Sequence, residues 1–109
     1  MDINYELYKV FYYVADTLSF SEASKQLFIS QSAVSQSIKA LEKKLDQVLF
    51  IRSTKKVQLT PEGEILFKHI EPAMNLIHKG ETQLLEANTL NGGQLRIAAS
   101  DTICRYFLL

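Results

Sequence analysis

The feature that most constrains the fold is a pair of adjacent amphipathic segments, at about residues 20–28 and 31–45, joined by the stretch "FIS". Each segment follows a good helix N-cap. Ser19 and Glu22 have the spacing of a capping box, and Ser30 precedes the second segment. Two helices joined by so short a turn cross at a steep angle, which predicts a helix-turn-helix.

The second of these helices has one apolar and one polar side. At roughly 100° per residue, Val34, Ile38 and Leu41 fall on the apolar side. The polar side carries Ser32, Ser35, Gln36, Lys39 and Lys43, with Gln31 in the first turn. Ser and Gln can read hydrogen-bonding patterns on base edges, and Lys can neutralise phosphates. The alternative is an ordinary solvated helix face, but the absence of acidic residues between Gln31 and Lys39 favours nucleic acid.

The formal net charge of zero hides a basic stretch between residues 36 and 60. This stretch holds six Lys or Arg residues, at 39, 43, 44, 52, 55 and 56, against two acidic residues, Glu42 and Asp46. A local basic patch is what a polyanion meets, whatever the total charge. Within it, β-prone runs at residues 50–52 and 57–59 flank the polar tip Ser53, Thr54, Lys55 and Lys56, which predicts a hairpin with a longer loop. A basic hairpin directly after a helix-turn-helix is a wing, although two solvated lysines in a loop remain the alternative.

Two further predicted helices flank the helix-turn-helix and the wing in the sequence. The first, at about residues 5–18, has an apolar stripe of Leu7, Val10, Phe11, Val14 and Leu18. Tyr8 and Tyr12, one turn apart, are either surface residues or contacts to a partner subunit. The last helix, at about residues 61–88, carries a heptad-like seam of Leu66, Ile70, Ala73, Ile77, Gly80 and Leu84. At 1.5 Å per residue it spans roughly 40 Å, which is too long for so small a domain to cover, and so we expect a homo-oligomer. A monomer whose helix folds back on its own domain is the alternative.

The remainder, "LNGGQLRIAASDTICRYFLL", looks like a helix end, a strand and a turn at Ser100. A lone strand needs neighbours, so we interpret residues 91–109 as the truncated start of an α/β domain. The expected architecture is therefore mainly α: a winged helix-turn-helix at 1–60, a dimerisation helix at 61–90, and this truncated segment.

Other classes of function find little support in the sequence. No apolar run approaches a membrane span, and no signal pattern opens the chain. The single Cys104 has no partner for an internal disulfide and fits a cytoplasmic location. His69 and His78 are too far apart to share a helix face as metal ligands, and no base is patterned near a serine. We therefore expect no catalytic residue, no metal and no cofactor.

The stretches "FYYVADTLSFSEASKQLFISQSAVSQSIKALEKKL", "LFIRSTKKVQLTPEGE" and "GGQLRIAAS", in this order, resemble the N-terminal half of LysR-type transcriptional regulators. The resemblance implies double-stranded DNA as partner, dimers or tetramers through the linker helix, and an inducer-binding domain when the complete chain is present. It places Gln31, Ser32, Ser35, Gln36 and Lys39 on the recognition helix and Arg52 in the wing. It also places Ser100, with Thr102, at a turn that often contacts the inducer. Asp46 and Val48 depart from the usual Gly and Pro before the wing, but Asp tolerates left-handed backbone.

The predicted DNA-binding set contains residues of the helix and of the wing: Ser30, Gln31, Ser32, Ser35, Gln36, Lys39, Lys43, Arg52, Ser53, Lys55 and Lys56. The predicted dimerisation set is Tyr8, Tyr12, Leu66, Ile70, Ala73, Ile77 and Leu84. The remaining alternatives are a winged-helix module of another regulator family and one that makes protein contacts. An enzyme is the least supported class.

Overall fold

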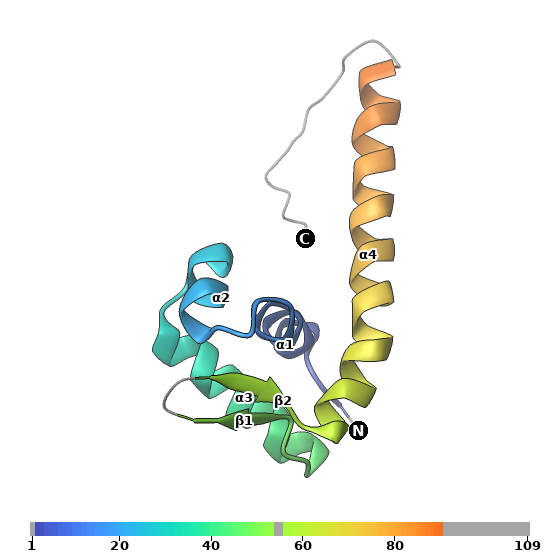
Figure 1. The fold of residues 1–109 in the computed structure, drawn as a ribbon. Coiled ribbons are helices and arrows are strands. Elements are labelled where there is room, and N and C mark those ends of the chain that lie inside the picture. Colours follow the sequence, from blue (N-terminus) through green and yellow to red (C-terminus); the bar gives the residue numbers. More distant parts are fainter. Residues whose placement is uncertain (1, 54–55, 91–109) are drawn as a thin grey trace. The chain divides into compact units, whose positions relative to one another are not determined.

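The computed structural model describes residues 2–53 and 56–90, and the chain divides into two units, residues 1–74 and 75–109. Figure 1 labels the elements in chain order: α1 (Tyr5–Thr17), α2 (Phe20–Leu27), α3 (Gln31–Leu45), β1 (Phe50–Arg52), β2 (Val57–Leu59) and α4 (Pro61–Leu90). The predicted winged helix-turn-helix is confirmed. The final segment, at residues 91–109, lies outside the described residues.

The first three helices begin at side-chain caps. The Asn4 side chain accepts the backbone N–H of Glu6 at 2.8 Å. Ser19 Oγ accepts the N–H of Glu22 at 3.0 Å, and Ser30 Oγ accepts the N–H of Ala33 at 3.0 Å. Each cap satisfies an amide that has no partner within the helix. The predicted N-caps Ser19 and Ser30 are thus confirmed.

The same helices end at residues in the left-handed region of backbone space. Leu18 has φ 52°, Phe28 has φ 59° and Asp46 has φ 55°. The tolerance expected of Asp46 is confirmed. The predicted ends at Leu18 and Phe28 were one residue too late, because both residues are C-caps and lie beyond the last helical turn. Leu18 is also 46% exposed, so it does not extend the buried stripe of α1.

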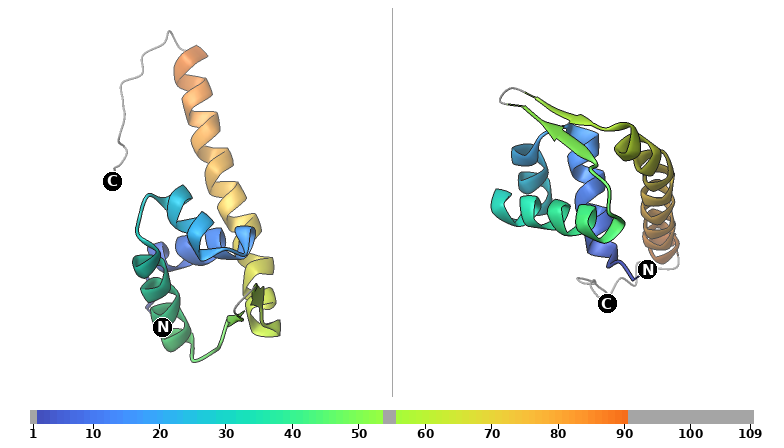
Figure 2. Two further views of the ribbon diagram at one scale, coloured as in Figure 1. Left: turned by 60° about the vertical axis from the view of Figure 1, so that its left-hand side comes forward. Right: turned by 90° about the horizontal axis from the view of Figure 1, so that it is seen from below.

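The core of residues 1–74 lies between the three short helices, the hairpin and the first turns of α4 (Figure 2). Its largest fully buried side chains are Phe11, Val14, Val34, Ile38, Leu41 and Leu49. Aromatic rings connect the layers: Phe11 lies 5.4 Å from Phe50 of β1 and 6.5 Å from Phe67 of α4, measured between ring centroids. Burial of these side chains is the main term that holds the helices together.

The wing is a two-stranded antiparallel hairpin in which Phe50 pairs with Leu59 and Arg52 with Val57. Thr60 connects its two ends: the hydroxyl donates to the carbonyl of Val48 at 2.6 Å and accepts the N–H of Gly63 at 2.9 Å. The same residue therefore closes the hairpin and caps α4. Gly63 is required at its position, since a Cβ there would collide with the carbonyl oxygen of Leu49.

α4 continues through Pro72 to Leu90, two residues beyond the predicted end. Between residues 61 and 74, Leu66, Phe67 and Ile70 pack against the core. Met74 is 2% exposed, and the Tyr5 hydroxyl donates to its sulfur at 3.8 Å. Among residues 2–53 and 56–90, no helix is long and apolar enough to cross a membrane.

Candidate nucleic-acid interface

Helix α3 presents its polar side to solvent. Val34, Ile38 and Leu41 are fully buried in the core. Because these residues point inward, the residues on the opposite side remain accessible: Ser30, Gln31, Ser32, Gln36, Lys39 and Lys43 are exposed, and Ser35 is half-buried. The predicted division of this helix into an apolar and a polar face is therefore confirmed.

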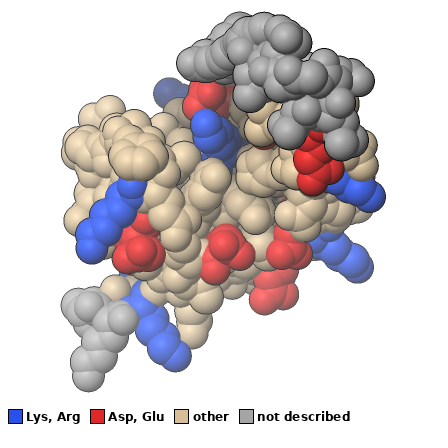
Figure 3. Space-filling view, turned by 90° about the horizontal axis from the view of Figure 1, so that it is seen from above, with Lys and Arg blue, Asp and Glu red and all other residues tan. Residues whose placement is uncertain are grey.

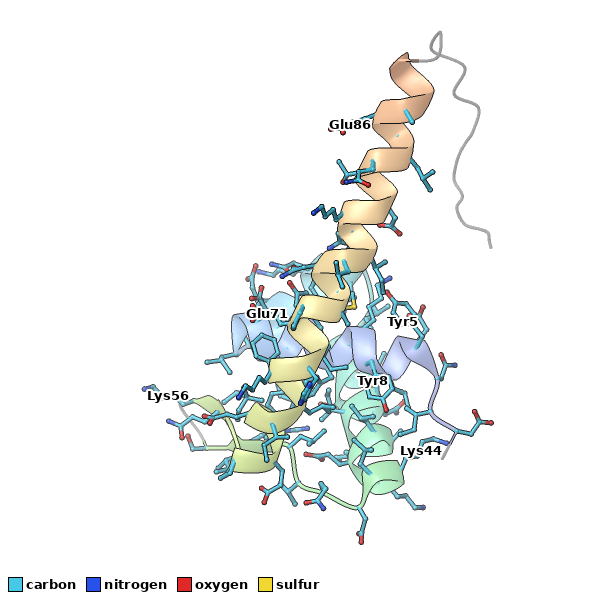
Figure 4. The ribbon with its side chains drawn as sticks, turned by 90° about the vertical axis from the view of Figure 1, so that its right-hand side faces the viewer. Tyr5, Tyr8, Lys44, Lys56, Glu71 and Glu86 are labelled. Carbon is cyan, nitrogen blue, oxygen red and sulfur yellow. The ribbon has the colours of Figure 1, made fainter. Side chains whose placement is uncertain are left out.

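The wing supplies a second set of polar side chains. Arg52, Ser53 and Lys56 are exposed, whereas Lys55 lies outside the described residues. Ser53 shapes the tip, since its N–H donates to the carbonyl of Lys56 at 2.9 Å and its Oγ accepts the N–H of Lys56 at 3.1 Å. Figure 4 shows two cations of the basic stretch at residues 36–60 well apart from each other: Lys56 lies on the hairpin and Lys44 on α3. The positively charged side chains are thus distributed over two elements, α3 and the wing.

A cleft of about 630 Å³ separates the wing from the starts of α2 and α3. It is lined by Leu18, Ser19, Phe20, Ser21, Gln31, Ser53, Lys56, Val57 and Gln58. The structure therefore brings Gln31 of α3 and Lys56 of the wing to the walls of one concave surface. Sequence spacing alone does not predict this meeting, because the two residues belong to different elements.

The sequence analysis missed Phe20, which lies at this cleft. The guanidinium carbon of Arg52 lies 4.2 Å from the centroid of the Phe20 ring. Phe20 also meets Phe50 edge to face, at a centroid distance of 6.1 Å and an interplanar angle of 70°. Phe50 and Arg52 share one side of β1 because side chains alternate along a strand. That alternation was readable from the sequence, but the ring that both residues meet was not.

Acidic side chains lie among basic ones on the face that Figure 3 shows. A surface of mixed charge offers a polyanion little net attraction, unlike the acid-free side of α3 between Gln31 and Lys39. Among the described residues, no group of three or more His, Cys, Asp or Glu side chains could hold a metal ion.

The residues predicted for dimerisation fall into two groups. Leu66, Ile70 and Tyr8 are half-buried and pack against the core of their own unit. Tyr12 is also half-buried, and its ring stacks on Phe67 at a centroid distance of 6.1 Å. Ala73, Ile77 and Leu84 are exposed, and the sequence analysis missed two further exposed side chains, Leu76 and Leu85. The N-terminal part of the seam thus packs against the core of its own unit, and only its later part is exposed. The effector residues Ser100 and Thr102 lie outside the described residues.

Comparison with known proteins places this arrangement in a family. Residues 5–64 match the model of the bacterial regulatory helix-turn-helix proteins of the lysR family. The chain is 36% identical over 104 residues to the HTH-type transcriptional regulator CysL of Bacillus subtilis, which covers 95% of this chain and 35% of the relative. An uncharacterised HTH-type regulator of Methanocaldococcus jannaschii is 37% identical over 94% of this chain and 34% of its own length. The chain thus spans about a third of the length of these curated relatives.

A solved structure points the same way. The complex of the CbnR DNA-binding domain with DNA superposes with a TM-score of 0.65 and 26% identity, over 78% of this chain and 98% of that one. Residues 5–64, which match the family model, include the winged helix-turn-helix described above. The chain belongs to the LysR family of bacterial regulatory helix-turn-helix proteins.

Proposed function

We propose that the chain is the DNA-binding part of a transcriptional regulator, and that it binds double-stranded DNA through α3 and the wing. The observation that carries the proposal is the placement of Gln31 and Lys56 on one cleft, beside the exposed polar side of α3. An α-helix fits the major groove, and a wing beside it can reach phosphates or the minor groove.

The division of roles follows from the chemistry of the side chains. Ser32, Ser35 and Gln36 can donate to and accept from base edges, so we assign them to base reading with Gln31. Lys39, Lys43, Arg52 and Lys56 carry positive charge, so we assign them to the phosphate backbone, together with Lys55. Ser30 and Ser53 offer additional hydroxyl groups at the start of α3 and at the tip of the wing. The solved complex of CbnR with DNA supports a nucleic-acid partner for this fold.

Selection of duplexes from a randomised pool, followed by a gel shift, tests the proposal. The chain should enrich a defined sequence and bind it more tightly than a scrambled duplex of the same length. Specific sites are typically preferred by on the order of a thousandfold or more at physiological salt. A pool that stays random, with equal affinity for both duplexes, would instead support a winged module that makes protein contacts.

We further propose that two copies associate through α4. The exposed apolar side chains beyond residue 74 support this, because Leu76 is 67%, Ile77 41% and Leu84 68% exposed. A two-fold partner that presents the same stripe would cover both copies, and the two recognition helices would then meet separate half-sites of one duplex. Tyr8 and Tyr12 become secondary contacts in this arrangement, because both already pack within their own unit.

A small-molecule inducer belongs to the proposal only for a chain with a complete effector domain. Ser100 and Thr102 are the residues of this chain that would contribute to such a site. We expect no saturable inducer binding by residues 1–109 alone, and isothermal titration calorimetry with candidate inducers would test this.

A further inference from the structure

We infer that Phe20 is a positioning residue for DNA binding: its ring holds the guanidinium of Arg52 and thereby sets the wing against α2. This inference rests on the DNA-binding function proposed above and adds to it a residue that does not itself contact the duplex. It also assigns Arg52 a second task besides any contact of its own with phosphate.

The geometry that carries the inference is local and specific. The guanidinium carbon of Arg52 lies 4.2 Å from the centroid of the Phe20 ring, well within the range of a cation–π contact. Phe20 is half-buried and its ring is held in turn by Phe50, which is 5% exposed. The Phe20 ring of α2 thus meets both Phe50 and Arg52 of β1, and the wing that carries these two residues is a hairpin of two three-residue strands. So short a hairpin is marginally stable by itself and takes its position from what it packs against.

The contact lies where the position of the wing matters. Phe20 lines the cleft whose other walls include Gln31 of α3 and Ser53 and Lys56 of the wing. If the wing moved away from α2, Lys56 would move relative to Gln31. Gln31 in a DNA groove and Lys56 at the phosphate backbone could then no longer make their contacts at the same time. A guanidinium has five N–H donors, so Arg52 can lie over the Phe20 ring and still donate to a phosphate. The contact with the ring therefore orders this cation before DNA arrives, which lowers the entropy lost on binding.

Four variants and one control separate positioning from general packing. Phe20→Leu keeps apolar bulk but removes the ring face, and Phe20→Tyr keeps the face. Arg52→Gln removes the charge at similar length, and the double variant Phe20→Leu/Arg52→Gln completes a cycle. Leu27→Ala on the same helix is the matched control, because Leu27 packs against the core and is not among the residues that line the cleft.

The first readout needs no DNA. Amide hydrogen exchange of β1 and β2 should accelerate in Phe20→Leu and in Arg52→Gln, stay at the wild-type rate in Phe20→Tyr, and change little in Leu27→Ala beyond its effect on global stability. Unchanged exchange in both Phe20→Leu and Arg52→Gln would overturn the inference, whatever the protein does with DNA.

The second readout is affinity for the selected duplex, measured by fluorescence anisotropy over a range of salt concentrations. Phe20→Leu should weaken binding about two- to fivefold, the size of one exposed cation–π contact. Phe20→Leu should weaken binding less in the Arg52→Gln background than in the wild-type background, because the cation over the ring is then absent and only the contact with Phe50 remains to be lost. Equal, additive losses in the two backgrounds would overturn the inference. If wild-type protein selects no duplex while the exchange result holds, the proposed function fails and the positioning of the wing by Phe20 stands.

Discussion

Glu42 accepts a hydrogen bond from the backbone N–H of Leu49 at 2.8 Å, and this bond ties α3 to the start of the wing. The same carboxylate oxygen accepts the N–H of Phe50 at 3.3 Å. Leu49 and Phe50 are buried, so these amides have little access to water in place of the carboxylate. One acidic side chain within the basic stretch therefore has a structural task.

Replacing Glu42 should destabilise the domain. Glu42→Ala leaves two amides without their acceptor, which costs about 1–3 kcal/mol for each buried group left unpaired. Urea unfolding measures the loss. The control is Lys44→Ala, an exposed position on the same helix, which should change the free energy of unfolding by less than about 0.5 kcal/mol. Equal stability of the two variants would show that the carboxylate does not hold the wing.

Two glycines of α4 should respond to alanine in opposite ways. At Gly63 an added Cβ meets the backbone oxygen of Leu49 and lies 2.9 Å from Leu59 Cδ2, so Gly63→Ala should destabilise by about 1–3 kcal/mol or more. At Gly80 an added Cβ meets nothing within 4 Å, so Gly80→Ala should stabilise the helix by about 0.5–1 kcal/mol. Thermal unfolding followed by circular dichroism measures both. A stable Gly63→Ala variant would contradict the close approach of α4 to the wing.

Base reading and phosphate contact should separate in binding experiments. Gln36→Ala should lower the preference for the selected duplex over a scrambled one, by about 1–3 kcal/mol if Gln36 reads a base directly. Lys56→Ala should weaken both duplexes alike and reduce the slope of log affinity against log salt by about 0.9. Gln83→Ala, an exposed glutamine of α4, is the control and should change neither quantity. An undiminished preference in Gln36→Ala would remove Gln36 from the base-reading set.

The oligomeric state should depend on the exposed apolar side chains of α4. Ile77→Asp and Leu84→Asp place a charge on the proposed interface, so sedimentation at micromolar concentration should shift from dimer to monomer. Thr82→Asp, on the opposite side of the helix at 100° per residue, should leave the dimer intact. Ile70→Asp is unsuitable, because Ile70 packs against the core of its own unit. Wild-type protein that sediments as a monomer would contradict the proposal.

The stability of the domain at alkaline pH should depend on Tyr12. Burial raises the pKa of this phenol above its ordinary value of 10.0, and the negative charge of Asp16 adds to the shift. The unfolded chain then releases the phenolic proton at a lower pH than the folded protein does. Stabilisation that is fully present below the unfolded pKa is therefore lost as pH rises through the folded pKa. Tyr12→Phe should lose less stability in that window, measured by urea unfolding. An identical alkaline loss in both proteins would show that other groups control it.

The helix starts and the apolar face of α3 were predictable because the signals are local. Ser19 and Ser30 cap amides three residues away, and Val34, Ile38 and Leu41 repeat at the helical period. The ends at Leu18 and Phe28 were placed one residue late, because neither is the glycine that usually occupies a left-handed position.

Contacts between residues far apart in the chain could not be predicted from the sequence. The buried Met74, the bond from Glu42 to Leu49 and the stacking of Arg52 on Phe20 all depend on how separate elements meet. The sequence also could not show which residues of the α4 seam are buried within their own unit. Apolar residues at heptad spacing are compatible with packing on a partner helix and with packing on a domain core. Ile70 packs against the core, whereas Leu84 is exposed.

The local caps of the first three helices have a kinetic consequence. Asn4, Ser19 and Ser30 specify where each helix begins through residues two or three positions away, so no distant contact is needed to define these starts. The wing is attached by bonds that also join residues close in the chain, from Glu42 to Leu49 and from Val48 to Thr60. Helical domains rich in local contacts of this kind fold on the order of microseconds to milliseconds. The unit of residues 1–74 can therefore finish folding soon after Met74 has emerged from the ribosome, in less time than the addition of one further residue takes.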